Sequence, residues 1–177
     1  MLNVEFSVAS MKIIKTVEQK EVWDHWKKIE GFSNDNFRTD IRNPLPTDPK
    51  WHLSLLESID IEKLYIISSD DWRDVSKNTF LVKNVAENLE TDSLNKDTIR
   101  IINNIKEKIN FIKRGCLFDT RLIIVTDNLG GPYTIIEGNK RAVALLSCNL
   151  LTEKEIYLGI SNNICNYVWA RHTYPNL

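Results

Sequence analysis

The chain has 177 residues, of which 42% are hydrophobic and 27% are charged, and its net charge is −1. This length predicts one domain with a sizeable core, and the near-neutral charge excludes a molecule-wide attraction to nucleic acid. Cys116, Cys148 and Cys165 show no metal-binding spacing, so we expect free thiols and no structural zinc. No cationic segment precedes a long apolar run, and we expect a cytoplasmic protein without a membrane span.

The first 50 residues change character along their length. Residues 1–10 alternate loosely between apolar and polar side chains, which predicts a strand or an extended arm. Thr16 to Glu30 carries a broad apolar stripe and is followed by a glycine, which predicts a helix. Residues 33–50 are polar, contain three prolines and are predicted to be irregular. We interpret residues 1–50 as an N-terminal helical and irregular extension packed on a domain of residues 51–177.

The next stretch predicts short elements of both kinds. Asp60 to Leu64 is expected to form a helical turn. Tyr65 to Ile67 is predicted to be a buried strand, and Phe80 to Val82 is another short strand candidate. Val82 to Leu89 places its apolar residues on one face, which indicates a helix.

The second half of the chain gives stronger signals. Asp97 to Arg114 repeats isoleucine at three- and four-residue steps and predicts a long helix, whose basic residues we interpret as a solvated face. Arg121–Val125 and Tyr133–Ile136 flank a turn rich in Gly and Pro and predict a β-hairpin. Glu155–Ile160 is a further strand, and Asn163–His172 is predicted to be a last helix. Strands mixed with helices in this order favour an α+β fold with a small mixed sheet flanked by helices.

Two adjacent carboxylates, Asp70 and Asp71, follow the predicted strand at residues 65–67. Such a pair can act as a general base or bind a metal ion. It can equally cap a helix or close a turn, which is the commoner use of such residues.

The most informative stretch is Thr134 to Leu146, which reads as a strand, a glycine turn and an apolar helix. Gly138 suits a tight connection because it adopts backbone angles that a side chain forbids. Asn139 is expected to be the N-cap of the helix. Lys140 and Arg141 fall in the first helical turn, where the helix dipole disfavours cations. An anion bound there would reverse that cost, because it would pair with both side chains and with the free backbone N–H groups.

The sequence Ile-Ile-Glu-Gly-Asn-Lys-Arg-Ala-Val-Ala-Leu at residues 135–145 resembles the signature turn of the ParB/sulfiredoxin superfamily. Members of that superfamily combine an apolar strand, a glycine, polar or basic residues ending in arginine, and an Ala-rich helix. Gly138, Lys140 and Arg141 match the glycine, the basic position and the final arginine. Asn139 stands where sulfiredoxins need their reactive cysteine, so sulfinic-acid reduction is excluded. The resemblance covers roughly Trp51 to Ser161.

The resemblance implies a ParB/sulfiredoxin-like domain that binds the phosphates of ATP or CTP with Mg²⁺. It places nucleotide binding at Gly138, Asn139, Lys140 and Arg141. Glu137 is the expected catalytic carboxylate, with Asp70 or Asp71 as its metal or base partner. The expected reaction is nucleotide hydrolysis or phosphoryl transfer to a small hydroxyl substrate. We expect no dedicated metal site built from protein ligands alone.

Two alternatives stay open at this point. The first is a non-catalytic interaction or DNA-associated module that keeps the scaffold without the chemistry, which the Asn139-Lys140 pair favours. DNA binding itself is not favoured by the net charge. The second is a nuclease, for which the chain shows no dense cluster of carboxylates or histidines.

Overall fold

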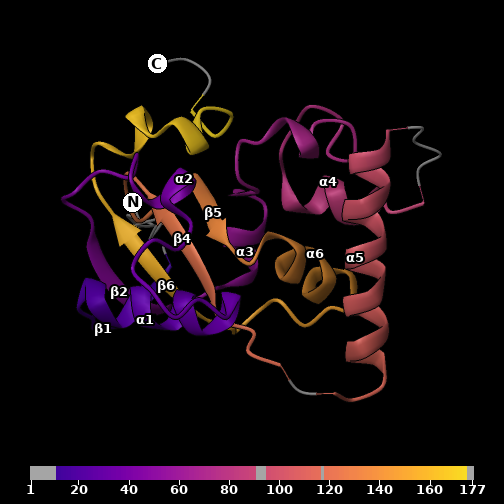
Figure 1. The fold of residues 1–177 in the computed structure, drawn as a ribbon, viewed down its shortest axis with the longest axis horizontal. Coiled ribbons are helices and arrows are strands. Elements are labelled where there is room, and N and C mark those ends of the chain that lie inside the picture. The colour runs from indigo at the N-terminus through magenta and orange to yellow at the C-terminus, as the bar shows by residue number, and fades with distance from the viewer. Residues whose placement is uncertain (1–10, 91–94, 117, 175–177) are drawn as a thin grey trace, which may run out of the picture.

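Six strands form one mixed sheet in the computed structural model, which describes residues 11–90, 95–116 and 118–174 (Figure 1). The order of the strands across the sheet is β1-β2-β6-β4-β5-β3. The strands are β1 (Lys12–Thr16), β2 (Lys50–Leu55), β3 (Leu64–Tyr65), β4 (Leu122–Thr126), β5 (Tyr133–Glu137) and β6 (Glu155–Ile160).

The pairing of the strands is antiparallel over part of the sheet and parallel elsewhere. β2 pairs antiparallel with both of its neighbours, β1 and β6, and β6 then runs parallel to β4. β4 and β5 form the predicted antiparallel hairpin, and β3 lies parallel to β5 at the edge. A mixed sheet with helices confirms the α+β class.

Helices occupy two places relative to the sheet. They are α1 (Gln19–Glu30), α2 (Thr39–Arg42), α3 (Ser58–Ile61), α4 (Val82–Glu87), α5 (Lys96–Lys113) and α6 (Asn139–Ser147). α1 contacts β2, whereas α4, α5 and α6 pack together to one side of the sheet (Figure 1). The strong helix predictions from the sequence are therefore confirmed, with ends that agree to within a few residues. No helix within the described ranges has the length and apolarity needed to cross a membrane.

The core is built on the central strands and on aromatic residues of α1. All five residues of β4 are buried, which explains their unbroken apolar or β-branched character. Trp26 is fully buried, and the rings of Trp23 and Trp51 lie 5.5 Å apart between centroids. Residues before position 51 thus supply both an edge strand and part of the core of the same sheet.

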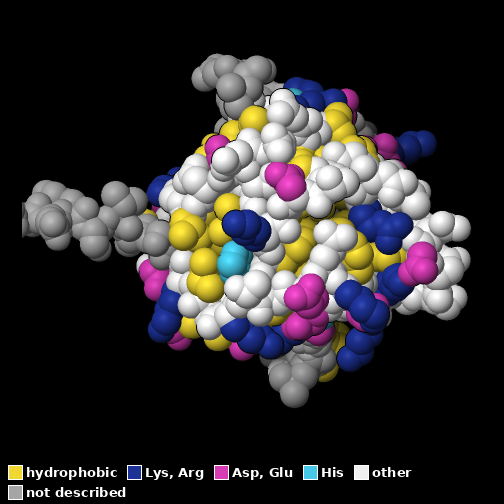
Figure 2. Space-filling view, turned by 90° about the vertical axis from the view of Figure 1, so that its left-hand side faces the viewer, with side chains coloured by type: hydrophobic (Ala, Val, Ile, Leu, Met, Phe, Trp, Pro, Cys, Tyr) yellow, Lys and Arg dark blue, Asp and Glu magenta, His cyan; other side chains and the backbone are white. Residues whose placement is uncertain are grey.

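The face at the left of Figure 1 carries charges of both signs. Figure 2 shows Lys and Arg side chains interspersed with Asp and Glu side chains over the described residues of that face. This mixture matches the near-neutral composition of the chain. It gives this face no extended positive surface among the described residues.

The end of the chain folds differently from the prediction. Residues 163–172 do not form an α-helix but two short 3₁₀ turns, Ile164–Asn166 and Val168–Ala170. Tyr167 between them has an extended backbone, and its hydroxyl donates to the carbonyl of Ile41 at 2.7 Å. The helical prediction is therefore wrong because this long-range contact interrupts the local pattern.

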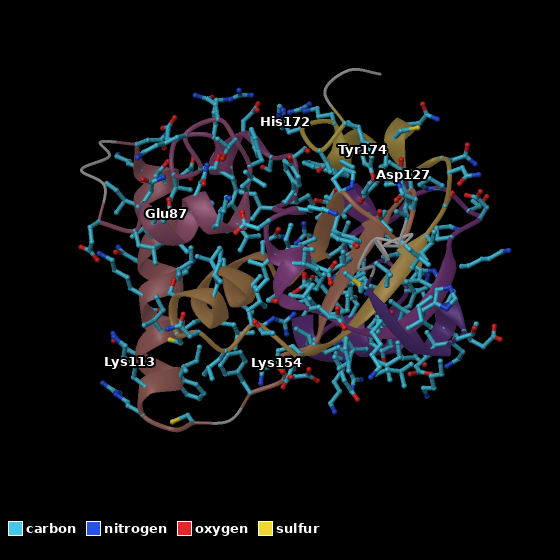
Figure 3. All side chains as sticks on the ribbon, turned by 180° about the vertical axis from the view of Figure 1, so that it is seen from behind. Glu87, Lys113, Asp127, Lys154, His172 and Tyr174 are labelled. Atoms are coloured by element: carbon cyan, nitrogen blue, oxygen red, sulfur yellow. The ribbon has the colours of Figure 1, made fainter. Side chains whose placement is uncertain are left out.

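The last described residue is fixed against the β4–β5 loop. The backbone N–H of Asp127 donates to the hydroxyl of Tyr174 at 3.1 Å, and that hydroxyl contacts the Asp127 carboxylate at 3.2 Å. Figure 3 shows the two side chains close together at the end of the hairpin. Asp127 therefore holds the loop in place.

The predicted strands at residues 65–67 and 80–82 are shorter than expected. β3 ends at Tyr65, and Leu81 makes only an isolated bridge to it. Phe80 has a positive φ of 57°, which ends extended pairing there. The strand predicted for residues 1–10 lies outside the described residues. The three cysteines are free, as expected.

Candidate functional site

The glycine turn that the sequence singles out joins β5 to α6. Gly138 has φ 96° and ψ 18°, a left-handed conformation that favours glycine. A Cβ atom at this position would lie 2.6 Å from Cδ2 of Leu122 and 2.9 Å from Nη2 of Arg141. Only glycine fits this turn without displacing its neighbours.

Asn139 has a different role from the one predicted. The N-cap of α6 is Gly138, and Asn139 is the first helical residue. Its Oδ1 instead accepts a hydrogen bond from the backbone N–H of Ile67 at 2.9 Å. The N-cap prediction is wrong because the side chain turns away from its own helix and connects it to the segment that follows β3.

Arg141 is committed to contacts inside the protein. It is 7% exposed, and its Nη2 lies 3.0 Å from Oε1 of Glu137, four residues earlier. Its Nη1 donates to the carbonyl of Asp119 at 3.1 Å. Burial lowers the pKa of Arg141, while Glu137 and Asp119 favour the charged form. The guanidinium therefore fixes the turn in place, whereas the sequence pattern suggested an anion contact.

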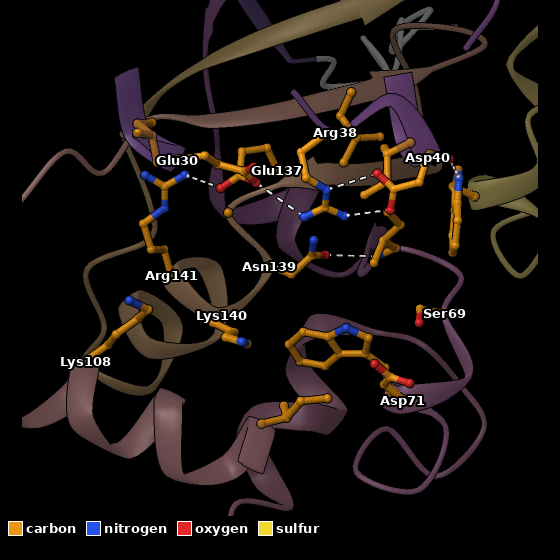
Figure 4. A pocket seen from close by; sticks show the side chains of 18 of the residues that line it. Glu30, Arg38, Asp40, Ser69, Asp71, Lys108, Glu137, Asn139, Lys140 and Arg141 are labelled. Carbon is orange, nitrogen blue, oxygen red and sulfur yellow. Dashed lines mark hydrogen bonds and ion pairs between the residues drawn. The ribbon is translucent and has the colours of Figure 1, made fainter. Parts of the chain in front are cut away.

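Glu137 is one of two neighbouring carboxyl groups, with Glu30, that lie between two arginines. Arg38 contacts Glu30 at 3.3 Å, and Arg141 contacts Glu137, so each carboxyl group has one arginine (Figure 4). Burial, together with a hydrogen bond to Glu30, raises the pKa of Glu137 to about 7, although Arg141 opposes the shift. Glu137 can therefore hold or release a proton near neutral pH.

Lys140 is one of the cations that the fold leaves available. Within the described part of the chain, its half-buried ammonium group makes no hydrogen bond or ion pair. Burial, reinforced by the nearby charges of Arg100 and Lys108, lowers the pKa of Lys140. Figure 4 shows the Lys140 side chain extending into open space beside the turn, with Lys108 of α5 on the same side.

These side chains surround a cavity of about 540 Å³. Its walls come from α1, α2, the segment around η1 (Asp70–Trp72), α5 and the start of α6. Among the described residues, five cationic and four carboxyl side chains line it. These are Arg38, Arg100, Lys108, Lys140 and Arg141, with Glu30, Asp40, Asp71 and Glu137.

The first turn of α6 adds hydrogen-bond donors to this cavity. Within the described residues, the backbone N–H groups of Asn139, Lys140 and Arg141 donate to no protein acceptor. Such unpaired donors at a helix N-terminus carry partial positive charge. Together with Lys140 they make this wall of the cavity suited to a negatively charged ligand.

The two predicted aspartates are separated by the structure. Asp71 lines the cavity, with its Oδ2 3.9 Å from Nη2 of Arg100. Asp70 is not among the lining residues and pairs with Arg73 at 2.8 Å and with Arg171 at 3.3 Å. Of the predicted carboxylates, Glu137 and Asp71 are brought to the cavity and Asp70 is not. Nowhere in residues 11–90, 95–116 and 118–174 do three metal-ligating side chains cluster.

Sequence reasoning missed most of the cavity lining outside the turn. Glu30 and Arg38 come from the stretch interpreted as an extension, and Lys108 from a helix face interpreted as solvated. One signal was available: Glu137 and Arg141 are four residues apart, a spacing that favours an ion pair at a helix start. The contributions of α1 and α5 depend on long-range packing that local patterns do not encode.

Comparison of the chain with models of protein families, with curated proteins and with solved structures found no match.

Proposed function

We propose that the chain is a ParB/sulfiredoxin-like protein whose cavity binds the phosphates of a nucleotide, ATP or CTP, with Mg²⁺. The observation that carries the proposal is Lys140, a half-buried ammonium group with no carboxylate partner in the described residues, placed beside unpaired N–H groups of α6. A bound phosphate would pair with this ammonium group and with those donors at once. The turn sequence that resembles the superfamily supports the same ligand.

The residues divide into ligand-facing and positioning groups. Lys140 and Lys108 face the cavity and would neutralise phosphate oxygens, while Arg141 positions Glu137. Glu137 would orient a nucleophile, either a water molecule or a substrate hydroxyl, and accept its proton near neutral pH. Asp71 is the lining carboxylate that could share a Mg²⁺ ion with the phosphates, because Mg²⁺ prefers one or two carboxylates together with phosphate oxygens.

A second candidate function is nucleotide binding without turnover, as in an interaction module. The observation that favours it is the engagement of Glu137 with both Arg141 and Glu30, which occupies the expected catalytic carboxylate. Release of inorganic phosphate from ATP or CTP separates the two candidates. Turnover that is lost in Glu137→Gln supports catalysis, and tight binding without turnover supports the module.

The binding proposal is tested by calorimetric titration of ATP and CTP in the presence of Mg²⁺. We expect Lys140→Ala to weaken binding by about tenfold or more, because a charge-assisted hydrogen bond contributes about 1.5–3 kcal/mol. Lys106→Ala is the matched control, since Lys106 lies on α5, pairs with Glu90 at 3.0 Å and does not line the cavity. Absence of binding to either nucleotide, or equal affinities for the wild type and Lys140→Ala, would overturn the proposal.

A further inference from the structure

A second cavity of about 460 Å³ adjoins the first. The two cavities share Ile29, Lys108 and Arg141 as lining residues. The second cavity is otherwise lined by Phe111, Phe118, Glu107 and Asp119. Lys108 therefore stands at the boundary between a strongly charged space and one that holds two aromatic rings.

Phe111 and Phe118 each keep part of the ring surface exposed beside the second cavity. Phe111 lies on α5 and is 46% exposed, and Phe118 is only partly buried against the core. Their ring centroids are 6.1 Å apart with an interplanar angle of 55°. By contrast, Trp72 in the first cavity is 6% exposed, and the indole N–H of Trp169 donates to the carbonyl of Asp40 at 2.6 Å. Phe111 is thus the aromatic side chain with the most accessible ring beside the two cavities.

Glu107 adds a polar feature to the second cavity. It is exposed and makes no hydrogen bond or ion pair within the described residues. The carboxylate of Asp119 is already engaged, since it accepts from the backbone N–H of Arg121 at 3.0 Å and lies 3.7 Å from Nδ1 of His25. An ionised carboxylate only accepts hydrogen bonds, so Glu107 favours a ligand group that donates them.

We infer that the second cavity is the base subsite for a nucleotide whose phosphates lie against Lys108 and Lys140, an inference that rests on the proposed function. The base packs against Phe111 and Phe118, because every nucleobase has a π-face that stacks on aromatic side chains. Glu107 accepts from an exocyclic amino group. The subsite therefore selects bases that carry an exocyclic amino group, such as adenine or cytosine, over bases that lack one, such as hypoxanthine or uracil.

The test compares two probes that share the phosphates and differ in the base. Binding of ATP and of inorganic triphosphate is measured by calorimetry for the wild type, Phe111→Ala and the control Leu150→Ala, which removes an exposed apolar side chain outside both cavities. We expect Phe111→Ala to weaken ATP binding about tenfold and to leave triphosphate binding unchanged. Leu150→Ala is expected to change neither. Because Phe111 is substantially exposed, its removal does not open the core.

Selection of the base is tested with ATP and ITP, in which an oxygen replaces the amino group. We expect the wild type to prefer ATP by about fivefold or more, and Glu107→Gln to narrow that preference, because an amide can donate as well as accept.

The outcomes separate this inference from the proposed function. If ATP and triphosphate both bind and Phe111→Ala weakens neither, the base subsite is overturned while phosphate binding stands. If the loss of ATP affinity appears in Trp169→Ala and not in Phe111→Ala, the base lies in the first cavity and the inference is wrong. If neither probe binds, both the proposed function and the subsite are overturned.

Discussion

The cations that line the main cavity form two groups that use positive charge in opposite ways. In the first group, Arg38 and Arg141 are each paired with a glutamate, and the guanidinium of Arg141 is almost completely buried. In the second group, Lys140 is half-buried and has no carboxylate partner in the described part of the chain. The sequence places Lys140 and Arg141 side by side, yet the fold gives them different surroundings.

This difference shows that two residues that are adjacent in a sequence motif need not have the same role. A buried cation without a partner is very unfavourable, so a deeply buried arginine is found with carboxylates. A half-buried lysine keeps part of its contact with water, so it can remain charged without a carboxylate partner until an anionic ligand binds. The first kind of residue determines where the turn lies, and the second is available to bind.

The largest expected effect is on stability, and it tests this division directly. At pH 8, Arg141→Met is expected to lower the free energy of unfolding by about 3–5 kcal/mol, because it leaves the ionised Glu137 buried without its cation. Lys140→Ala is expected to change stability by no more than about 0.5 kcal/mol. Urea denaturation of both variants measures the contrast. If the two substitutions cost the same, Lys140 and Arg141 do not differ as described.

A smaller effect is expected from the titration of Glu137. Its pKa in the folded protein is about 7, above its ordinary value of 4.5, so the folded state holds a proton that the unfolded chain has released. The stability contributed by this group is complete below pH 4.5 and is lost as the pH rises to about 7. We therefore expect Glu137→Gln to flatten the decline of stability over this range by about 2–3 kcal/mol. Chemical denaturation at pH 5, 6, 7 and 8 provides the measurement, and parallel pH profiles for the two proteins would contradict it.

The smallest effect concerns the link between α6 and the segment that follows β3. Asn139→Ala removes the acceptor for the backbone N–H of Ile67. Ile67 as a whole residue is 6% exposed, so this donor is buried. We expect a loss of about 1–2 kcal/mol in the free energy of unfolding, the typical cost of leaving a buried donor unpaired. Amide hydrogen exchange at Ile67 is a more local measure. Unchanged protection of that amide in the variant would show that Asn139 does not hold the loop.

Much of the fold could be predicted from local patterns. The isoleucine repeat of α5, the apolar stripe of α1 and the β4–β5 hairpin follow directly from periodicity and turn residues. The helix predicted at residues 163–172 does not form, because the hydroxyl of Tyr167 donates a hydrogen bond to the carbonyl of Ile41, which is far away in sequence. Long-range contacts of this kind override a weak helical pattern.

The position of the site in the chain could be predicted from the sequence, but the set of residues that surround it could not. The turn at residues 137–141 does border the cavity, which its composition indicated. The partners that decide the roles of Glu137 and Lys140 are Glu30 on α1 and Lys108 and Arg100 on α5. Their approach depends on how two helices pack around the sheet, and single-sequence periodicity carries no information about that packing.

The fit of Gly138 limits how this cavity could be redesigned. A side chain at this position would meet both Leu122 in β4 and Arg141 in α6, so the space between these two residues is already filled. A saturation library at residue 138 should return glycine alone, whereas libraries at positions 108 and 140 should tolerate many residues while altering what binds. Engineering of ligand preference in this scaffold should therefore begin at the lysines and leave the turn untouched.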